Sequence, residues 1–253
     1  MEMIKGELAS TFVVLLVFIA LYLYCIYRAV RGKPPMIRKV PGLDAMEEAI
    51  GRAVEMGRPI YYSTGVGSLD GGDMPMTMAG MTLLGYSASL AASRGAELRY
   101  IAAVPQLVPI AEDMLRTAYR DAYKPEQITF VPSQVALMST IVGTYEREKP
   151  AANFLLGALY WETVVIAEAG ARAGAMQVGG TGRLYQVPFV VALCDYSLIG
   201  EELLAAGAYV SREPSQLGSI LASDIIRFIT IALIIIYVIG SLFGVDASTI
   251  LRF

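Results

Sequence analysis

A glycine-rich stretch, YYSTGVGSLDGGDMPMT from Tyr61 to Thr77, has the residue types of an anion-binding loop. It follows a predicted strand and leads into a predicted helix, and helix N-termini that follow parallel strands commonly bind anions. Asp73 is also predicted to cap that helix, with Pro75 in its first turn. The residues predicted to bind a ligand here are Ser63, Thr64, Gly65, Gly67 and Asp73.

The glycine spacing matches neither common nucleotide-binding motif. The NAD fingerprint requires GxGxxG and an acidic residue at the end of the next strand. Here the glycines read GxGxxxG, and no acidic residue ends the next predicted strand. The chain also has no GK[ST] sequence and therefore no Walker A loop. Asp70 and Asp73 would repel a phosphate unless a cation intervened. Two interpretations stay open, a tight turn that uses glycine for positive φ and a site for a small anionic ligand, and the sequence identifies no cofactor.

Three carboxylates follow predicted apolar strands and are candidate catalytic residues: Glu162, Asp195 and Glu201. Paired carboxylates at strand ends can transfer protons or hold a divalent cation. The alternative is structural, because Asp195 is a natural N-cap and adjacent Glu201 and Glu202 point in different directions on a helix. Because the chain has no histidine, a histidine-dependent mechanism is excluded, and no metal-binding cluster is recognised.

A second glycine cluster, QVGGTGRLYQ from Gln177 to Gln186, adds Thr181 as a candidate ligand-binding residue. Thr181 and Arg183 could hold an anion, or the segment could be a plain loop. Glu168 stands in an otherwise apolar helical stretch, where it is either buried or exposed on one face. Tyr160 and Trp161 could stack on a ligand, although such aromatics are more often core or interface residues.

The elements that would position these residues alternate between strands and helices. Short apolar strands are predicted at 59–64, 98–104, 128–132, 152–159, 175–180 and 188–194, and helices at 44–56, 73–93, 106–123, 133–148, 162–174 and 197–210. This alternation predicts an α/β fold with a Rossmann-like, doubly wound and mostly parallel sheet. The predicted domain spans residues 44–224 and is preceded by a basic, proline-containing linker at 28–43.

Two long apolar segments flank this domain, at residues 8–27 and 228–245, and both are uncharged. Each is long enough to cross a bilayer as a helix, so transmembrane helices are predicted at both ends. A cleaved signal peptide or a buried helical hairpin is the alternative. Five basic residues follow the first segment closely and Lys5 alone precedes it. The charge bias predicts a protein of the cell (inner) membrane whose central domain is cytoplasmic and whose N- and C-termini are outside.

The stretch from Met74 to Ser93 carries no charge, which is unusual for a helix of a single small domain. A helix that is apolar or small on all sides is expected to be buried on all sides. Contact with another subunit, an unusually buried core and a third membrane span all remain possible. Self-association is therefore predicted, either as a homo-oligomer or within a larger membrane complex. The slight negative net charge argues against nucleic acid as a partner.

The segments ANFLLGALYWETVVIAEAGARAGAMQVGGT and VPFVVALCDYSLIGEELLAAGAYVS resemble a family of uncharacterised prokaryotic membrane-anchored proteins, known as a domain of unknown function. The turn Gly200-Glu201-Glu202-Leu203 is the most recognisable part of this resemblance. The resemblance implies the same architecture and no catalytic residue. Two functions are therefore expected from the sequence: a membrane-anchored scaffold or small-ligand-responsive module, and a membrane-tethered enzyme acting on a nucleotide or other anionic metabolite.

Overall fold

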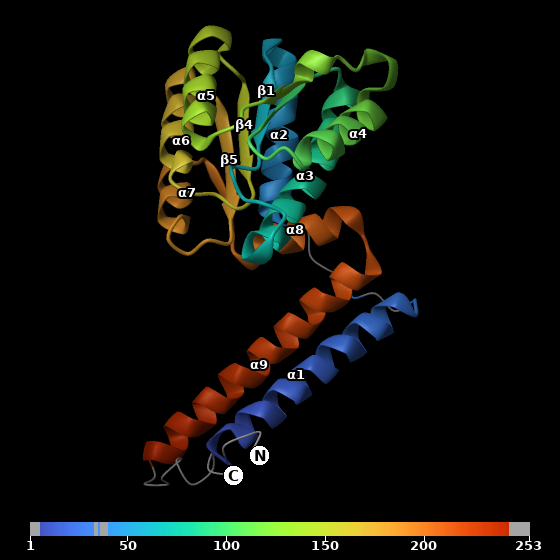
Figure 1. The fold of residues 1–253 in the computed structure, drawn as a ribbon, viewed down its shortest axis with the longest axis vertical. Coiled ribbons are helices and arrows are strands. Elements are labelled where there is room, and N and C mark those ends of the chain that lie inside the picture. The colour runs from blue at the N-terminus through green and yellow to red at the C-terminus, as the bar shows by residue number, and fades with distance from the viewer. Residues whose placement is uncertain (1–5, 33–34, 36–39, 243–253) are drawn as a thin grey trace. The chain divides into compact units, whose positions relative to one another are not determined.

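The computed structural model describes residues 6–32, 35 and 40–242 and divides the chain into two units (Figure 1). One unit combines residues 1–37 with residues 212–253, and the other contains residues 38–211. The second unit is an α/β domain, which contains every candidate site residue. The predicted span at 228–245 extends beyond the described residues at its last three positions.

A six-stranded sheet forms the centre of the α/β domain, and all of its neighbouring strands are parallel. The order across the sheet is β3-β2-β1-β4-β5-β6. The strands are β1 (Ile60–Ser63), β2 (Leu98–Ala102), β3 (Ile128–Phe130), β4 (Ala152–Leu156), β5 (Met176–Thr181) and β6 (Tyr196–Ile199). This is the order of dinucleotide-binding Rossmann folds, in which the chain reverses its direction of winding between β1 and β4. The predicted fold class is confirmed.

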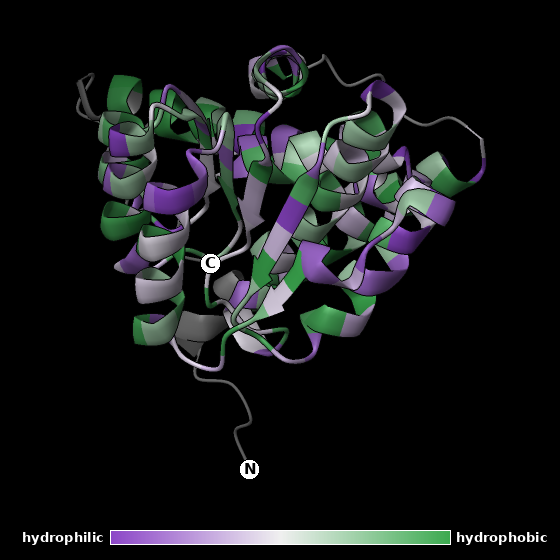
Figure 2. Ribbon diagram, turned by 90° about the horizontal axis from the view of Figure 1, so that it is seen from above, coloured by the Kyte–Doolittle hydropathy of each residue, from purple (hydrophilic) through white to green (hydrophobic). Residues whose placement is uncertain are grey.

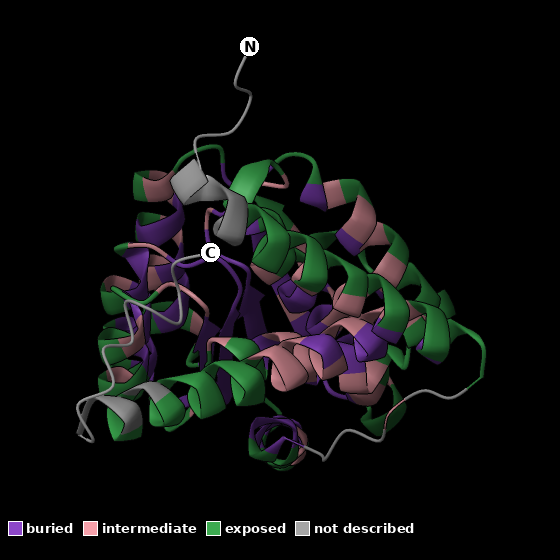
Figure 3. Ribbon diagram, turned by 90° about the horizontal axis from the view of Figure 1, so that it is seen from below, coloured by how far each residue is buried: buried purple, intermediate pink, exposed green. Residues whose placement is uncertain are grey.

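Two helical layers cover this sheet, and the strands between them are mostly buried (Figures 1 and 3). One layer contains α2 (Pro41–Met56), α3 (Met74–Arg94), α4 (Leu107–Tyr119) and α8 (Glu201–Ser211). The other contains α5 (Gln134–Glu148), α6 (Glu162–Ala173) and α7 (Val187–Leu193). Both layers mix hydrophobic and hydrophilic residues along their helices, as expected for elements with one side on the core (Figure 2).

Local sequence explains several of the helix boundaries. Ser133 caps α5 by accepting a hydrogen bond from the backbone N–H of Ala136. Helices α2 and α3 end at Gly57 and Gly95, which adopt the left-handed conformation that glycine tolerates best. Each helix has a proline in its first turn, where the missing N–H costs little.

Helix α3, which carries no charge before Arg94, is buried by helices of its own chain. It packs against α2, α4 and α8, and its buried residues include Gly80, Leu83, Leu84 and Ala88. Its apolar composition is thus explained by packing within the domain, and a third membrane span would not have these neighbours. The absence of charge between Met74 and Ser93 no longer provides an argument for a subunit contact.

One predicted strand is wrong. The segment at 188–194 forms helix α7, and the last strand, β6, comes after it. The run of β-branched residues favoured a strand, but Pro188 lies in the first turn of a helix, and Val190 is the one buried residue of the seven in α7. The helix predicted at 197–210 therefore begins at Glu201, after a strand that ends at Ile199.

The other unit contains two long apolar helices, α1 (Gly6–Val30) and α9 (Pro214–Leu242), which pack against each other. Gly218 allows this close approach, because a Cβ at this position would lie 2.8 Å from Cα of Ile26. Both helices are long and apolar enough to span a membrane, over Phe12–Val30 and Pro214–Ile236.

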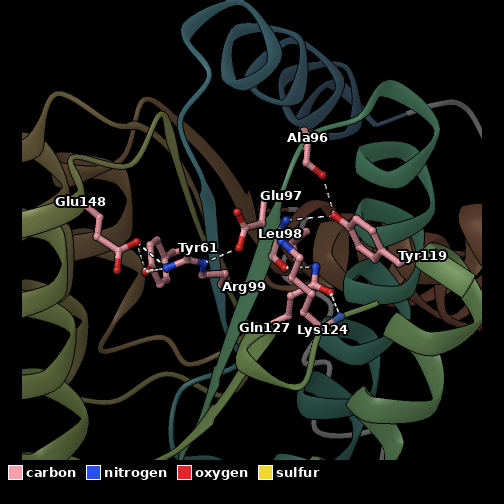
Figure 4. A network of polar contacts seen from close by, with 9 residues as sticks. All are labelled: Tyr61, Ala96, Glu97, Leu98, Arg99, Tyr119, Lys124, Gln127 and Glu148. Atoms are coloured by element: carbon pink, nitrogen blue, oxygen red, sulfur yellow. Dashed lines mark hydrogen bonds and ion pairs between the residues drawn. The ribbon is translucent and has the colours of Figure 1, made fainter. Parts of the chain in front are cut away.

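A polar network ties the first half of β2 to its neighbours (Figure 4). Arg99 of β2 donates to Glu148 at the end of α5 and to Glu97, and the hydroxyl of Tyr61 donates to the same Glu148 at 2.8 Å. Beyond β2, the hydroxyl of Tyr119 accepts from the backbone N–H of Leu98 and donates to the carbonyl of Ala96. Because these contacts join β2 to β1 and to helices α4 and α5 of the same domain, we interpret the network as structural.

Candidate functional site

The carboxyl edge of the sheet, beside the β1/β4 reversal, is where a fold of this type binds its ligands. The connections that follow β1, β4 and β5 meet at this edge. Together they hold most of the residues that the sequence singled out. The members are Ser63, Thr64, Gly65, Gly67, Asp73, Tyr160, Trp161, Glu162, Thr181 and Arg183.

Three side chains link these connections, and we call them the latch: Asp73, Tyr160 and Arg183. The hydroxyl of Tyr160 donates to Oδ2 of Asp73 at 2.6 Å, and Arg183 forms an ion pair with Oδ1 of the same carboxylate. The guanidinium of Arg183 also donates to the hydroxyl of Tyr160 and lies 3.9 Å from the centre of its ring. The hydrogen bond to Asp73 raises the pKa of Tyr160, so the phenol remains a donor at neutral pH.

Asp73 does not cap α3 as predicted. Its side chain makes no capping hydrogen bond to that helix and is used entirely in the latch. An ion pair with an arginine 110 positions away offers this carboxylate a stronger partner than a backbone N–H. Helix α3 therefore begins with Pro75 in its first turn but without a side-chain cap.

The glycine-rich turn packs directly against the connection that follows β4. A Cβ on Gly67 would lie 2.3 Å from Cβ of Ala158, and a Cβ on Gly65 would lie 2.8 Å from Oε1 of Glu162. Gly65 also has a φ of +73°, which glycine adopts with least strain. These glycines thus allow two chain segments to touch at the point where a dinucleotide-binding fold would accept phosphate.

The candidate hydroxyl groups near the turn are buried and bonded within the chain. Ser63 donates to the carbonyl of Ile101 at 3.1 Å, and Thr64 shares a hydrogen bond of 2.8 Å with the hydroxyl of Tyr100. Thr181 accepts a hydrogen bond from the backbone N–H of Arg183. A ligand would have to replace these contacts to be bound by these hydroxyl groups, and their predicted binding role stays a prediction.

Glu162 is fully buried at the start of α6. Its carboxylate accepts hydrogen bonds from the side-chain amide of Gln134 at 2.5 Å and from the backbone N–H of Tyr160 at 3.1 Å. These two donors and the adjacent Gly65 surround it, so it supports the connection after β4. Its hydrogen bond with the backbone N–H of Tyr160 connects it to the latch.

The other candidate carboxylates are not members of the latch. Asp195 precedes β6 and accepts from the backbone N–H of Gln177 at 2.7 Å, which places it at the amino edge of the sheet. The prediction that Asp195 follows a strand and caps a helix is wrong, because helix α7 precedes it and strand β6 follows it. Glu201 and Glu202 begin α8, where Glu202 accepts from the backbone N–H of Ile199. Glu168 is 52% exposed and pairs with Arg172, so the exposed alternative holds.

The polar side chains that converge at this edge bind and position one another. No three carboxylate or cysteine side chains among the described residues come together as metal ligands. The latch offers a cation, a carboxylate and a phenol, but they neutralise and bond one another. Sequence reasoning considered Arg183, Asp73 and Tyr160 separately and missed their convergence, which depends on the order of the strands.

Comparisons with known proteins give a family and no activity. No curated protein and no solved structure matches the chain. The model of the Domain of unknown function (DUF6754) matches residues 1–251. This match confirms the resemblance to a family of unknown function, and the chain belongs to the DUF6754 family.

Proposed function

We propose that this protein is a membrane-anchored, self-associating α/β module that serves as a scaffold or small-ligand-responsive component of a membrane complex. The two apolar helices support the anchoring, since both have the length and hydropathy of membrane spans. The basic residues that follow the uncharged segment at 8–27, including Arg28 and Arg31, favour a cytoplasmic domain with both termini outside. Reporter fusions at the two termini and in an exposed loop of the domain would test this topology.

One observation supports self-association more than any other: helix α7 is apolar and exposed. The stretch from Leu184 to Cys194 contains no charge, and Phe189 and Val191 of α7 are 44% and 50% exposed. An isolated exposed apolar residue is ordinary, but a charge-free helix with one buried residue is typical of a surface covered by a partner.

A groove on the same helical layer offers a complementary surface. It lies between α5 and α6 and has a volume of about 520 Å³. Apolar residues, among them Val142, Val164 and Val165, line it together with the charged residues Glu146, Lys149, Glu168 and Arg172. Helix α6 also contacts α7, so the groove and the exposed helix belong to one continuous face. A second copy related by two-fold symmetry can place its α7 against this groove while its own groove receives the first α7.

The oligomeric state of the full chain tests this proposal. We expect native mass spectra of protein gently extracted from membranes to show a discrete multimer. Phe189→Asp should shift the population towards monomer, because it places a charge in the apolar contact. Val54→Asp is the matched control, since Val54 is 42% exposed on α2 in the other helical layer. A wild-type protein that is strictly monomeric would contradict self-association.

A membrane-tethered enzyme or binding protein for an anionic metabolite is the second candidate. The observation that favours it is Arg183, whose Nε has no hydrogen-bond partner among the described residues although it is buried at the carboxyl edge. A small anion could reach this guanidinium by displacing Asp73. We expect a responsive site to show ligand-induced thermal stabilisation that Arg183→Met abolishes, and no response to any nucleotide or phosphate ester would remove this candidate.

A further inference from the structure

Each member of the latch is followed in sequence by a large, exposed apolar residue. Met74 follows Asp73, Trp161 follows Tyr160, and Leu184 follows Arg183. Met74 and Trp161 are about half exposed, and Leu184 is 86% exposed. Three such residues in three separate connections are not explained by the core of the domain, which none of them joins.

The latch holds these residues at one edge of the sheet. The contacts among Asp73, Tyr160 and Arg183 join the connections after β1, β4 and β5. The neighbouring apolar side chains are therefore carried by a bonded platform rather than by independent loops. Tyr185, which accepts a hydrogen bond from Arg183 and is also exposed, adds an aromatic residue to the same edge. We call Met74, Trp161, Leu184 and Tyr185 the apolar rim.

The chain segments that lead to the apolar helices leave the domain from the same edge. Gly42, at the start of α2, packs against Leu198 near the carboxyl end of β6. Helix α8 begins just after β6, and its Gly207 packs against Ala79 in the second turn of α3, which follows β1. Two residues, Arg212 and Glu213, separate α8 from α9. The two-residue connection therefore tethers the domain to α9 on the side of its carboxyl edge.

We propose that the apolar rim enters the interfacial layer of the membrane in which the protein is anchored. This inference rests on the membrane anchoring proposed above. The rim combines an aromatic pair, Trp161 and Tyr185, with two aliphatic side chains, Met74 and Leu184. Tryptophan and tyrosine are enriched at membrane interfaces because their rings have an apolar body and a polar group. The partner is the bilayer surface, at the level where headgroups meet acyl chains.

Trp161 is the sole tryptophan of the chain, so its fluorescence reports on this edge alone. The full-length protein would be reconstituted into vesicles whose lipids carry bromine near the headgroup end of the acyl chains. We expect these lipids to quench most of the Trp161 emission and acrylamide to quench little of it. Leu184→Asp should lower the lipid quenching and raise the acrylamide quenching, since it places a charge in the rim.

A second reporter provides the matched control. Met56, which is exposed at the end of α2, leads to the amino end of β1, away from the rim. In a Trp161→Phe, Met56→Trp protein, acrylamide should quench the tryptophan and brominated lipids should not. Equal lipid quenching of both reporters would overturn the proposal, because it would show that contact is not specific to the rim.

The remaining outcomes also decide the proposal. If acrylamide quenches Trp161 and the brominated lipids do not, the proposal is overturned. If neither quencher reaches Trp161, the proposal is overturned and a protein partner covers the rim. If acrylamide quenching of Trp161 then returns when the protein is diluted into excess lipid, that partner is a second copy of the chain. Failure of the protein to float with the vesicles would instead refute membrane anchoring, and a monomer by native mass spectrometry would refute self-association while leaving the rim test valid.

Discussion

Replacing Gly67 by alanine is expected to destabilise the α/β domain, whereas replacing Gly72 by alanine is not. A Cβ on Gly67 would lie 2.3 Å from Cβ of Ala158 and 3.0 Å from the carbonyl oxygen of the same residue. These atoms are fixed to the backbone, so one of two connections must shift. Nothing lies within 4 Å of a Cβ on Gly72, and its φ is not positive.

The expected magnitude follows from this overlap. Overpacking of this kind typically costs about 1–3 kcal/mol in the free energy of unfolding. For a domain of this size, about 1 kcal/mol shifts the unfolding midpoint by roughly 2–4 °C, so Gly67→Ala should melt roughly 2–12 °C lower. Gly72→Ala should be unchanged or gain about 0.4–1 kcal/mol, because alanine restricts the unfolded chain.

Thermal unfolding of the full-length protein in lipid nanodiscs, followed by Trp161 fluorescence, measures both variants on the same domain. If Gly67→Ala melts like the wild type, the turn does not pack against Ala158 and the packing interpretation is refuted. If it melts like the wild type but loses affinity for a phosphate ester, the turn is a binding loop instead. If Gly72→Ala is as destabilised as Gly67→Ala, the turn is intolerant of substitution for a reason other than steric contact.

Three further predictions concern buried groups. Asp73→Ala leaves the mostly buried Arg183 without its ion pair and should lower the unfolding free energy by up to about 3 kcal/mol in chemical denaturation, and adding Arg183→Met should recover part of the loss. Asn153→Leu removes the acceptor of the Tyr145 hydroxyl, 2.7 Å away in the core, and should cost about 1–3 kcal/mol in the same assay; an unchanged midpoint would contradict the bond. Burial raises the pKa of Cys194 to about 12, so in a Cys25→Ser protein the thiol should react slowly with iodoacetamide at mildly alkaline pH unless the protein is unfolded. As pH rises, the thiol loses its proton in the unfolded chain before it does in the folded one. The contribution of this group to stability should therefore be present below a pH of about 8.5 and be lost as pH rises towards 12. Denaturation of the wild type and of Cys194→Ala at a series of pH values measures this difference.

The sheet could be predicted because its strands are short apolar runs between helical segments. Buried parallel strands need apolar residues on both faces, and β4 and β5 are buried at every position. The segment at 188–194 shares this composition, but Val190 alone among its residues is buried. Composition alone cannot distinguish a strand in the core from a helix with an exposed apolar surface, and that one error also misplaced Asp195.

The latch could not be predicted in the same way. Asp73 and Arg183 are 110 positions apart and meet because β4 and β5 follow β1 across the sheet. Sequence spacing contains no information on that order. The packing of Gly67 on Ala158 could not be predicted either. A glycine that allows a close contact and a glycine that allows a positive φ look alike in sequence.

Fold class by itself argues for a nucleotide, because the strand order is the one that opens a ligand crevice between β1 and β4. The local structure argues differently, since glycines bring the two connections into contact and the latch binds the third to them. Function resides in sites rather than folds, so these contacts have the greater weight. An edge that is bonded internally and apolar outside is suited to a surface partner. We therefore expect proteins that share the glycines and latch to retain large apolar residues at positions 74, 161 and 184; if polar residues replace them while the latch persists, the latch serves packing alone.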